Sequence, residues 1–386
     1  MRKLIKFVYS FFVYFVAYVA LLFVKKKIPR NIWLIGELPN SARDNGLCLY
    51  EYCASLHYDN VYYVINKKSA EYNNISYKTN VIQYGSFRHI LYYLSATCIA
   101  TCFEGSLCLS YKFEKILRRI GVVHFKEVFL QHGITKDYIH TMSREEYQPD
   151  IFITSTIRET DYIIKKYKQP KNVVKLTGMA RFDKLVAKKH KGKRIILIAP
   201  TWRRYVGSTA FEETEFYKRY HSLLEKIAHI GGEKNSIILY LHNNFQQYSN
   251  HFEDIRGLKV LQSKDAEIGA LLREADLLVT DYSSIAFDFA YMKKPLVYYQ
   301  FDHDVFFGSH YEEGYFNYEN DGFGVVAFDE QGVLRTLDSI IESGYRNPVK
   351  YNERIENTFA FTDHSCCERI VKEIKKILES EKVDRC

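Results

Sequence analysis

Residues 277–299 read LLVTDYSSIAFDFAYMKKPLVYY, and this stretch decides the fold. Its first apolar run belongs to a predicted strand at 276–280, and a second run predicts a strand at 295–299. The segment between them has helical apolar spacing and predicts a helix at 285–292. A strand, a helix and a further strand in succession form a parallel pair joined by a right-handed crossover. The stretch therefore predicts one unit of a doubly wound α/β sheet.

The same alternation continues through most of the chain. Further strands are predicted at 31–36, 60–66, 80–85, 98–103, 127–131, 151–154, 173–177, 194–199, 236–241, 258–261 and 324–328. Predicted helices between them include 106–120, 156–167, 214–230, 266–274 and 330–342. This order predicts parallel sheets, in which ligands bind beyond the carboxyl ends of the strands.

The length of 386 residues indicates two domains. The basic stretch AKKHKGKR at 187–194 is polar, contains Gly192 and precedes a new strand, so we interpret it as a linker. We expect four parts, namely an apolar helix in 1–30, a first domain at 31–190, a second at 191–365 and a C-terminal helix at 366–386.

Composition excludes several classes of protein. Hydrophobic residues make up 47% and charged residues 26%, which excludes a disordered chain. The formal charge of +8 is consistent with an anionic partner, and without an Arg-rich tail we expect no nucleic acid. The 8 cysteines form no CxxC pair, so we expect buried free thiols and no metal site. The lone D-x-D sequence, Asp302-His303-Asp304, could bind a divalent metal, but three residues are a weak signal, and we interpret it as a solvated loop.

The N-terminal segment 7–24 is uncharged and rich in Phe and Tyr, and it is flanked by Arg2, Lys3 and Lys6 and by Lys25–Lys27. Its length is at the lower limit for spanning a bilayer. The aromatic content favours shallow insertion, and the basic flanks favour anionic headgroups. Because a KKK cluster follows, we do not expect a cleaved signal peptide. The sequence predicts a membrane-associating helix with the rest of the chain on the cytoplasmic side, and leaves open whether it spans the bilayer or lies in its interface.

Three polar clusters follow predicted strands. In QHGITKD at 131–137, His132 stands beside Gly133 at a strand end, where an imidazole can act as a general base. In PTWRR at 200–204, Arg203 offers planar donors suited to phosphate. In YLHNN at 240–244, His242 places a second imidazole in the second domain.

A fourth cluster, TDYSS at 280–284, is the sharpest. Ser283 or Ser284 can cap the helix that follows, and its first-turn N–H groups can then bind an anion. Asp288, one turn later, would face a ligand hydroxyl or a cation. The sequence Arg43-Asp44-Asn45-Gly46 after the first strand is less specific and can cap a helix or line the acceptor side.

Together these motifs resemble the CDP-glycerol glycerophosphotransferase family of teichoic-acid primases and polymerases. The resemblance runs from about residue 31 to about residue 364. Its motifs are, in order, Arg43-Asp44-Asn45-Gly46, His132-Gly133, Gly178-x-x-Arg181-x-Asp183, Pro200-Thr201-Trp202-Arg203, His242 and Thr280-Asp281-Tyr282-Ser283-Ser284. The sequence departs from the family at Gln131, Ala180, Tyr240 and Asn243, where Trp, Pro, Arg and Pro are common. The polymer backbone and the polyol therefore stay open.

The resemblance implies an α/β protein with two Rossmann-like doubly wound domains facing a central cleft, the GT-B-like arrangement. The domain at 31–190 would serve the acceptor and the domain at 191–365 the CDP-activated donor. The implied reaction transfers glycerol phosphate, or a related polyol phosphate, to a hydroxyl of a lipid-linked glycan or teichoic-acid-like polymer and releases CMP. It would occur at the cytoplasmic face of the cell membrane and need no cofactor or metal. The alternatives are a GT-B-type glycosyltransferase using a nucleotide sugar and a non-catalytic membrane-bound polymer-binding protein.

The resemblance also implies site residues. His132 would deprotonate the acceptor hydroxyl, and His242 would contact the pyrophosphate and stabilise charge as CMP leaves, although the two roles can be exchanged. The donor site would contain Gln131, Gly133, Ile134, Thr135, Arg203, Tyr240, Leu241, Ser283, Ser284 and Asp288. Glycerol versus ribitol as the polyol, and priming versus polymerisation, stay open.

Overall fold

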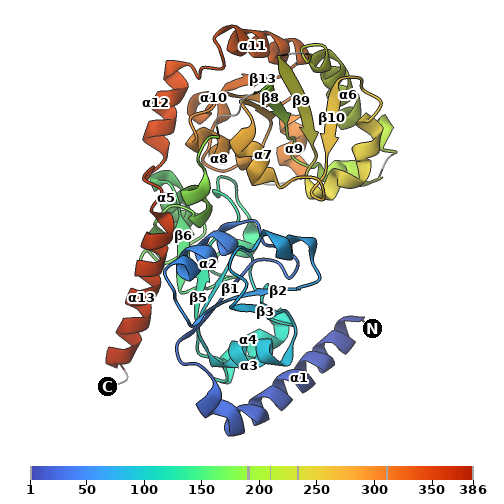
Figure 1. Ribbon diagram of the computed structural model, residues 1–386. Coiled ribbons are helices and arrows are strands. Elements are labelled where there is room, and N and C mark those ends of the chain that lie inside the picture. The colour runs from blue at the N-terminus through green and yellow to red at the C-terminus, as the bar shows by residue number, and fades with distance from the viewer. Residues whose placement is uncertain (1, 189–191, 209, 233, 310–311, 385–386) are drawn as a thin grey trace. The chain divides into compact units, whose positions relative to one another are not determined.

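Two sheets of parallel strands organise the chain (Figure 1). The computed structural model describes residues 2–188, 192–208, 210–232, 234–309 and 312–384. The chain divides into a first unit, residues 1–132, 141–184 and 363–386, and a second unit, residues 133–140 and 185–362. The change of unit at residues 184 and 185 lies close to the predicted linker, of which residues 189–191 are outside the described part.

The first unit contains a seven-stranded sheet in the order β3-β2-β1-β4-β5-β6-β7. Its strands are β1 (Ile32–Gly36), β2 (Val61–Ile65), β3 (Val81–Gln83), β4 (Ala96–Thr101), β5 (Lys126–Phe129), β6 (Ile151–Thr154) and β7 (Val174–Leu176). Its helices are α1 (Arg2–Val24), η1 (Lys25–Lys27), α2 (Asn45–Ser55), η2 (Ala70–Asn74), α3 (Phe87–Ser95), α4 (Tyr111–Arg119), η3 (His140–Met142), α5 (Ile157–Lys165), η4 (Ala180–Lys184) and α13 (Cys366–Asp384). The strand order reverses between β1 and β4, which makes this pair the switch point of the sheet.

The second unit contains a six-stranded sheet in the order β10-β9-β8-β11-β12-β13. Its strands are β8 (Arg194–Ile198), β9 (Asn235–Tyr240), β10 (Leu258–Leu261), β11 (Leu277–Thr280), β12 (Leu296–Tyr299) and β13 (Val325–Ala327). Its helices are η5 (Arg204–Ser208), η6 (Phe211–Glu213), α6 (Glu215–Ala228), η7 (Asn243–Phe252), α7 (Ile268–Glu274), α8 (Ile285–Tyr291), α9 (His303–Ser309), α10 (Tyr318–Asp321), α11 (Glu330–Glu342) and α12 (Val349–Thr358). Here the order reverses between β8 and β11.

The predicted strands are all present, with ends that differ from the predictions by no more than about two residues. The predicted helix at 106–120 is shorter, because it begins only at Tyr111. Residues 106–110 form a loop instead, in which Leu107, Cys108 and Leu109 are buried in a core cluster of the first unit. These apolar residues fill the core from a loop. The spacing of apolar residues along the sequence does not distinguish such a loop from a helix.

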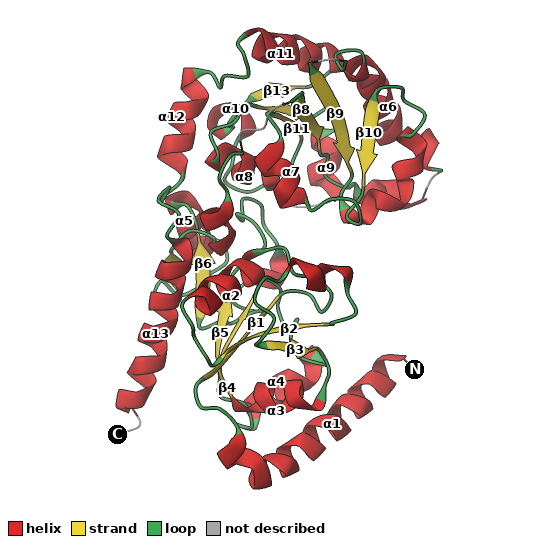
Figure 2. Cartoon of the chain, in the orientation of Figure 1, coloured by secondary structure: helices red, strands yellow, loops and turns green. Residues whose placement is uncertain are grey.

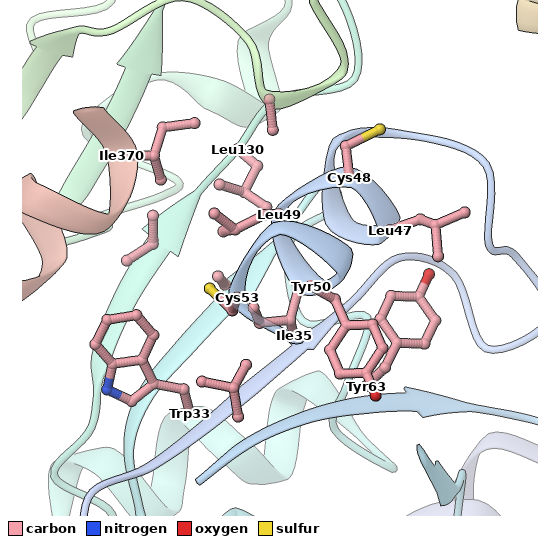
Figure 3. Close-up of a cluster of buried hydrophobic side chains, with 14 of the residues drawn as sticks. Trp33, Ile35, Leu47, Cys48, Leu49, Tyr50, Cys53, Tyr63, Leu130 and Ile370 are labelled. Atoms are coloured by element: carbon pink, nitrogen blue, oxygen red, sulfur yellow. The ribbon is translucent and has the colours of Figure 1, made fainter. Parts of the chain in front are cut away.

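The C-terminal helix α13 belongs to the first unit. The Asp183 carboxylate accepts the N–H groups of Cys366 and Cys367 at 2.7 and 2.8 Å, which satisfies orphan donors at the start of the helix. Figure 3 shows Ile370 of α13 beside Leu130 and Leu49 in the same buried cluster. The helix therefore completes the core that covers β1 and β5.

The N-terminal helix α1 is docked along one stripe of its surface. Ser10, Tyr14 and Ala17 are buried and recur at helical spacing. The Tyr14 ring lies 5.9 Å from the Tyr93 ring of α3 and 5.5 Å from the Phe113 ring of α4. Figure 2 shows α1 running beside these two helices. The segment Tyr9–Lys27 is long and apolar enough to cross a membrane, yet one of its faces belongs to the core of the first unit.

Candidate active site

The predicted polar clusters lie at the carboxyl ends of strands in both sheets. In the first unit, residues 42–46 follow β1 and His132 follows β5. In the second unit, the PTWR cluster follows β8 and the TDYSS cluster follows β11, so both stand at the switch point. Ligands of doubly wound sheets bind at this edge.

The loop after β1 is shaped by the carboxylate of Glu37, which is 1% exposed. It accepts the backbone N–H groups of Arg43, Asp44 and Leu47 at 3.0, 2.8 and 2.9 Å. Gly46 is needed at the start of α2, because a Cβ there would lie 2.8 Å from the carbonyl oxygen of Gly36. These contacts place Asp44 at the N-cap of α2, next to the end of β5.

His132 is held by residues from distant parts of the first unit. Its Nδ1 atom is hydrogen-bonded to the Asp44 carboxylate, while its side chain is 66% exposed. Arg181 donates to Asp44 Oδ1 and to the carbonyl oxygen of His132, both at 2.8 Å. The Phe103 ring, in the loop after β4, lies 4.9 Å from the imidazole. Because Nδ1 is occupied by Asp44, Nε2 is the ring nitrogen that remains for a substrate.

Opposing effects act on the pKa values of this pair. Desolvation lowers the pKa of His132, but the charge and hydrogen bond of Asp44 outweigh it, so the pKa is raised above its ordinary value. Desolvation raises the pKa of Asp44, but His132 and Arg181 outweigh it, so that pKa is lowered. Asp44 therefore stays ionised and strengthens the imidazole as a base.

The neighbours of His132 have mostly structural contacts. Gln131 is 1% exposed, and its amide donates to the carbonyl oxygen of Ile153 and to Glu159. Its φ of 59° is in the left-handed region, a strained conformation for a non-glycine residue. The predicted donor residues Gly133, Ile134 and Thr135 belong to the second unit, and the side chains of the last two are buried.

The segment that follows His132 is anchored within the second unit. Tyr138 N–H donates to the Glu312 carbonyl at 3.0 Å, and Tyr315 N–H donates to the Lys136 carbonyl at 3.2 Å. Gly314 is required at this crossing, because a Cβ there would lie 1.8 Å from the Lys136 carbonyl oxygen. The chain thus changes unit directly after His132.

Arg203 lies in the interior of the second unit and not at its surface. Its guanidinium pairs with Asp281 at 2.8 Å and with Asp302 at 2.7 Å, and its side chain is 0% exposed. Desolvation lowers the pKa of Arg203, but the two carboxylates outweigh it and raise that pKa. The hydroxyls of Tyr205, Tyr282 and Tyr220 complete the shell of these carboxylates. Arg203, which was predicted to bind phosphate, thus forms buried ion pairs that fix the loop after β11.

That loop carries the two serines. Ser284 occupies the N-cap position of α8 but its side chain makes no capping bond. Ser283 Oγ accepts the Ile285 N–H group at 3.4 Å, which is a weak contact. Both serines are partly exposed, whereas Asp288 is buried. The structure therefore leaves the two hydroxyls accessible.

His242 is exposed and follows β9. Its Nδ1 atom accepts the Asn244 N–H group at 3.2 Å, so its side chain caps η7. Its ring centroid lies 6.4 Å from the Trp202 ring. Tyr240 and Leu241, also predicted as donor ligands, have buried side chains. Within the described residues, no group of three or more His, Cys, Asp or Glu is arranged to hold a metal ion.

Sequence reasoning placed Asp44 and Arg181 in family motifs but did not connect them with His132. The sequence feature that could have connected them is that all three motifs follow strands of the same predicted sheet and so lie at the same edge of it. Reasoning from the sequence also missed Glu37, which acts on backbone N–H groups of the nearby loop and so leaves no side-chain pattern. It missed the pairing of Arg203 with Asp302 because these two residues are 99 positions apart.

Comparison with known proteins identifies the family of the chain. A family model described as CDP-Glycerol:Poly(glycerophosphate) glycerophosphotransferase matches residues 17–376. The minor teichoic acid biosynthesis protein GgaB of Bacillus subtilis (strain 168) is 29% identical over 373 residues, which are 92% of this chain and 40% of that protein. The teichoic acid glycerol-phosphate transferase of Staphylococcus aureus (strain NCTC 8325 / PS 47) is 23% identical over 269 residues, 65% of this chain and 64% of that protein. The chain thus spans less than two thirds of the length of either relative.

Solved structures share the fold. A structure of the wall teichoic acid polymerase TagF, from a variant soaked with CDPG, has a TM-score of 0.70 at 15% identity and covers 97% of this chain and 99% of that chain. The UDP-GlcNAc 2-epimerase of Neisseria meningitidis bound to UDP-GlcNAc has a TM-score of 0.55 at 9% identity, covering 89% and 99%. These likenesses confirm the predicted GT-B-like α/β fold.

Proposed function

Since the chain belongs to the CDP-glycerol:poly(glycerophosphate) glycerophosphotransferase family, we propose that it transfers glycerol phosphate, or a related polyol phosphate, from a CDP-activated donor to an acceptor hydroxyl. The acceptor is a membrane-linked polysaccharide or a teichoic-acid-like polymer, and the other product is CMP. The observation that carries this proposal is the Asp44–His132–Arg181 cluster at the end of β5. It supplies a base for a hydroxyl nucleophile at the sheet edge where ligands bind.

In the proposed reaction, Nε2 of His132 takes the proton of the acceptor hydroxyl. The hydroxyl oxygen attacks the phosphorus that carries the polyol, and the bond from this phosphorus to the bridging oxygen breaks. The electron pair leaves with the phosphate of CMP. Asp44 holds the ring and stabilises the imidazolium that forms. Such a transfer depends on positioning and charge neutralisation more than on covalent chemistry.

We assign the diphosphate of the donor to the second unit. Ser283 and Ser284 present partly exposed hydroxyls after β11, and His242 presents an exposed imidazole after β9. Hydroxyl and imidazole N–H groups can donate hydrogen bonds to phosphate oxygens as charge develops on the leaving group. Arg203 would act indirectly, because its pair with Asp281 fixes the loop that carries the serines.

We assign membrane attachment to α1. Its aromatic outer face is exposed, and the basic η1 follows it directly. The positive flank favours placement of the two units on the cytoplasmic side. Attachment there would bring the acceptor, which is anchored in the same membrane, to the enzyme.

Identification of the released nucleotide tests the proposal. The purified full chain is incubated with CDP-glycerol, CDP-ribitol or UDP-sugars and a lipid-linked acceptor, and nucleotides are separated by chromatography. We expect acceptor-dependent CMP from a CDP-polyol. Release of UDP from a nucleotide sugar, without CMP, would instead identify a glycosyltransferase, and no turnover of any donor would support a binding protein.

Removal of either serine hydroxyl should weaken donor binding. A hydrogen bond to a charged group contributes about 1.5–3 kcal/mol, so Ser283→Ala and Ser284→Ala should each raise the Kd for CDP-glycerol by about 10–150-fold. Titration calorimetry measures this effect, and Ser339→Ala on the exposed face of α11 is a matched control. Unchanged affinity in both variants would exclude this loop from the donor site.

Replacement of Asp44 by asparagine should shift the pH profile of kcat. Wild-type activity should fall as pH drops through the raised pKa of His132, above its ordinary value of about 6.5. Without the negative charge of Asp44 that pKa falls, so in Asp44→Asn the acidic limb should move to lower pH. Asparagine remains a good N-cap for α2. The control is Glu51→Gln in the same helix, where the carboxylate pairs with Lys184. An acidic limb at the same pH in Asp44→Asn and wild type would contradict this prediction.

A further inference from the structure

The helix α4 has an exposed face of unusual composition. Its exposed residues are Lys112, Lys115, Ile116, Arg119 and Ile120, the last being the C-cap. Lys112, Lys115 and Arg119 lie on the exposed side of the helix. Phe113 and Leu117 of the same helix are buried in the core. In the part of the chain that the structure describes, none of the three cations is within ion-pair distance of a carboxylate. The face therefore carries three cations without a salt bridge beside exposed isoleucines. The Nζ atom of Lys115 lies over the Tyr111 ring, 4.6 Å from its centroid, and Lys115 acts electrostatically on Glu104.

This face continues the apolar surface of α1. At 100° per residue, Ile116 and Ile120 are the exposed residues of α4 that lie nearest to Phe113 around the helix axis, both on the same side of it. The Phe113 ring contacts the Phe11 ring of α1 at 5.8 Å, and Phe11 stacks on Phe15 at 6.2 Å. Phe11 and Phe15 are 54% and 56% exposed, and Ile120 is 63% exposed. We call the exposed side chains of Phe11, Phe15, Ile116 and Ile120 the apolar strip; the buried Phe113 packs between the two helices, and Lys112, Lys115 and Arg119 lie farther around α4.

The docking of α1 limits how this strip can meet a bilayer. Tyr14 and Ala17 are buried against α3 and α4, and the Tyr14 hydroxyl accepts the Leu109 N–H group at 3.4 Å. A helix that crosses the bilayer has lipid or other apolar helices on every side. Because the middle of α1 is packed against α3 and α4 of the first unit, the helix can only lie in the membrane interface while it stays docked.

We propose that α4 is a second membrane-binding element, which together with α1 binds a bilayer surface that carries anionic phosphate headgroups. Ile116 and Ile120 enter the interface beside the rings of α1, and Lys112, Lys115 and Arg119 contact lipid phosphates. Apolar side chains next to exposed Lys and Arg are typical of interfacial helices. This inference rests on the membrane attachment in the proposed function and adds the surface and the lipid class.

Neutralisation of Lys112, Lys115 and Arg119 tests the proposed membrane-binding role of α4. Each Lys or Arg near an anionic membrane contributes about 1 kcal/mol, so the triple variant Lys112→Gln, Lys115→Gln, Arg119→Gln should bind phosphatidylglycerol-containing vesicles about a hundredfold more weakly. The matched control is Lys218→Gln, Arg335→Gln, Lys350→Gln, which neutralises three exposed cations on helices of the second unit. It has the same net charge and should bind like the wild type. Co-sedimentation of the full chain with phosphatidylcholine vesicles should differ little among the three proteins.

Further measurements keep the outcome clear. The melting temperature of each variant shows whether it is folded, and release of CMP with a water-soluble acceptor tests the proposed function independently of membrane binding. Equal binding of anionic vesicles by the folded triple variant and its control would overturn the proposal. A change of oligomeric state in sedimentation velocity, with vesicle binding unchanged, would also overturn it, since the α4 face would then contact a second copy of the chain.

Discussion

Replacing His132 by glutamine should lower kcat for CMP release by about 10²–10⁴-fold and leave the affinity for CDP-glycerol near the wild-type value. A general base at the acceptor hydroxyl accounts for a factor of this size. Glutamine keeps a polar side chain beside Asp44 but has no group that takes a proton near neutral pH. Donor affinity should persist because the donor residues are assigned to the second unit, whereas His132 is in the first.

The measurement is kcat as a function of pH for wild type and His132→Gln, together with calorimetry of CDP-glycerol binding. His124→Gln is the control, because His124 is an exposed histidine of the same unit. If His132→Gln keeps a near-normal kcat with the same acidic limb, His132 is not the base. His242→Gln would then be the variant expected to lose activity.

Replacing Arg203 by alanine should lower the free energy of unfolding of the second unit by about 3–5 kcal/mol. This is the usual cost of removing one partner from a buried ion pair, because the remaining charge is left uncompensated. Here two carboxylates, Asp281 and Asp302, would lose their shared cation. Donor binding should weaken as well, since the loop that carries Ser283 would lose its anchor.

Urea unfolding followed by Trp202 fluorescence measures this effect in a Trp33→Phe background, because the chain has 2 Trp residues and Trp202 is in the second unit. The neighbouring Arg204 is exposed, so Arg204→Ala should be nearly neutral and is the matched control. Normal stability of Arg203→Ala combined with weak donor binding would show instead that Arg203 contacts the donor directly.

The sequence was sufficient for the fold because strand position depends on local apolar runs. The runs at 151–154 and 258–261 became β6 and β10 with unchanged bounds. The predicted helix at 106–120 was too long because Leu109 lies four residues before Phe113, as in a helix, but fills the core from a loop. Spacing does not distinguish these two ways of burying an apolar side chain.

The candidate site was predictable only in part. A histidine after a strand can be placed at the sheet edge from its position alone, as His132 and His242 were. Its partner cannot, because Asp44 is 88 residues away and reaches His132 through the shape of the loop around Glu37. In the same way, Arg203 was expected to bind phosphate, but it is buried and paired with Asp302. This pairing could not be predicted, because the two residues are 99 positions apart and leave no local sequence pattern.

The position of α13 in the first unit has a consequence for synthesis on the ribosome. Cys367, Ile370 and Ile374 complete the core of a unit whose other strands and helices lie before residue 185. While the second unit is being translated, α13 is missing from that core. Apolar side chains such as Leu49 and Leu130 then stay exposed, and they can bind chaperones or associate with other chains. Elongation at about 5–20 residues per second makes this interval roughly 10–40 seconds. The first unit to emerge is thus the last to be finished, and slow translation of the second half should increase aggregation of the first.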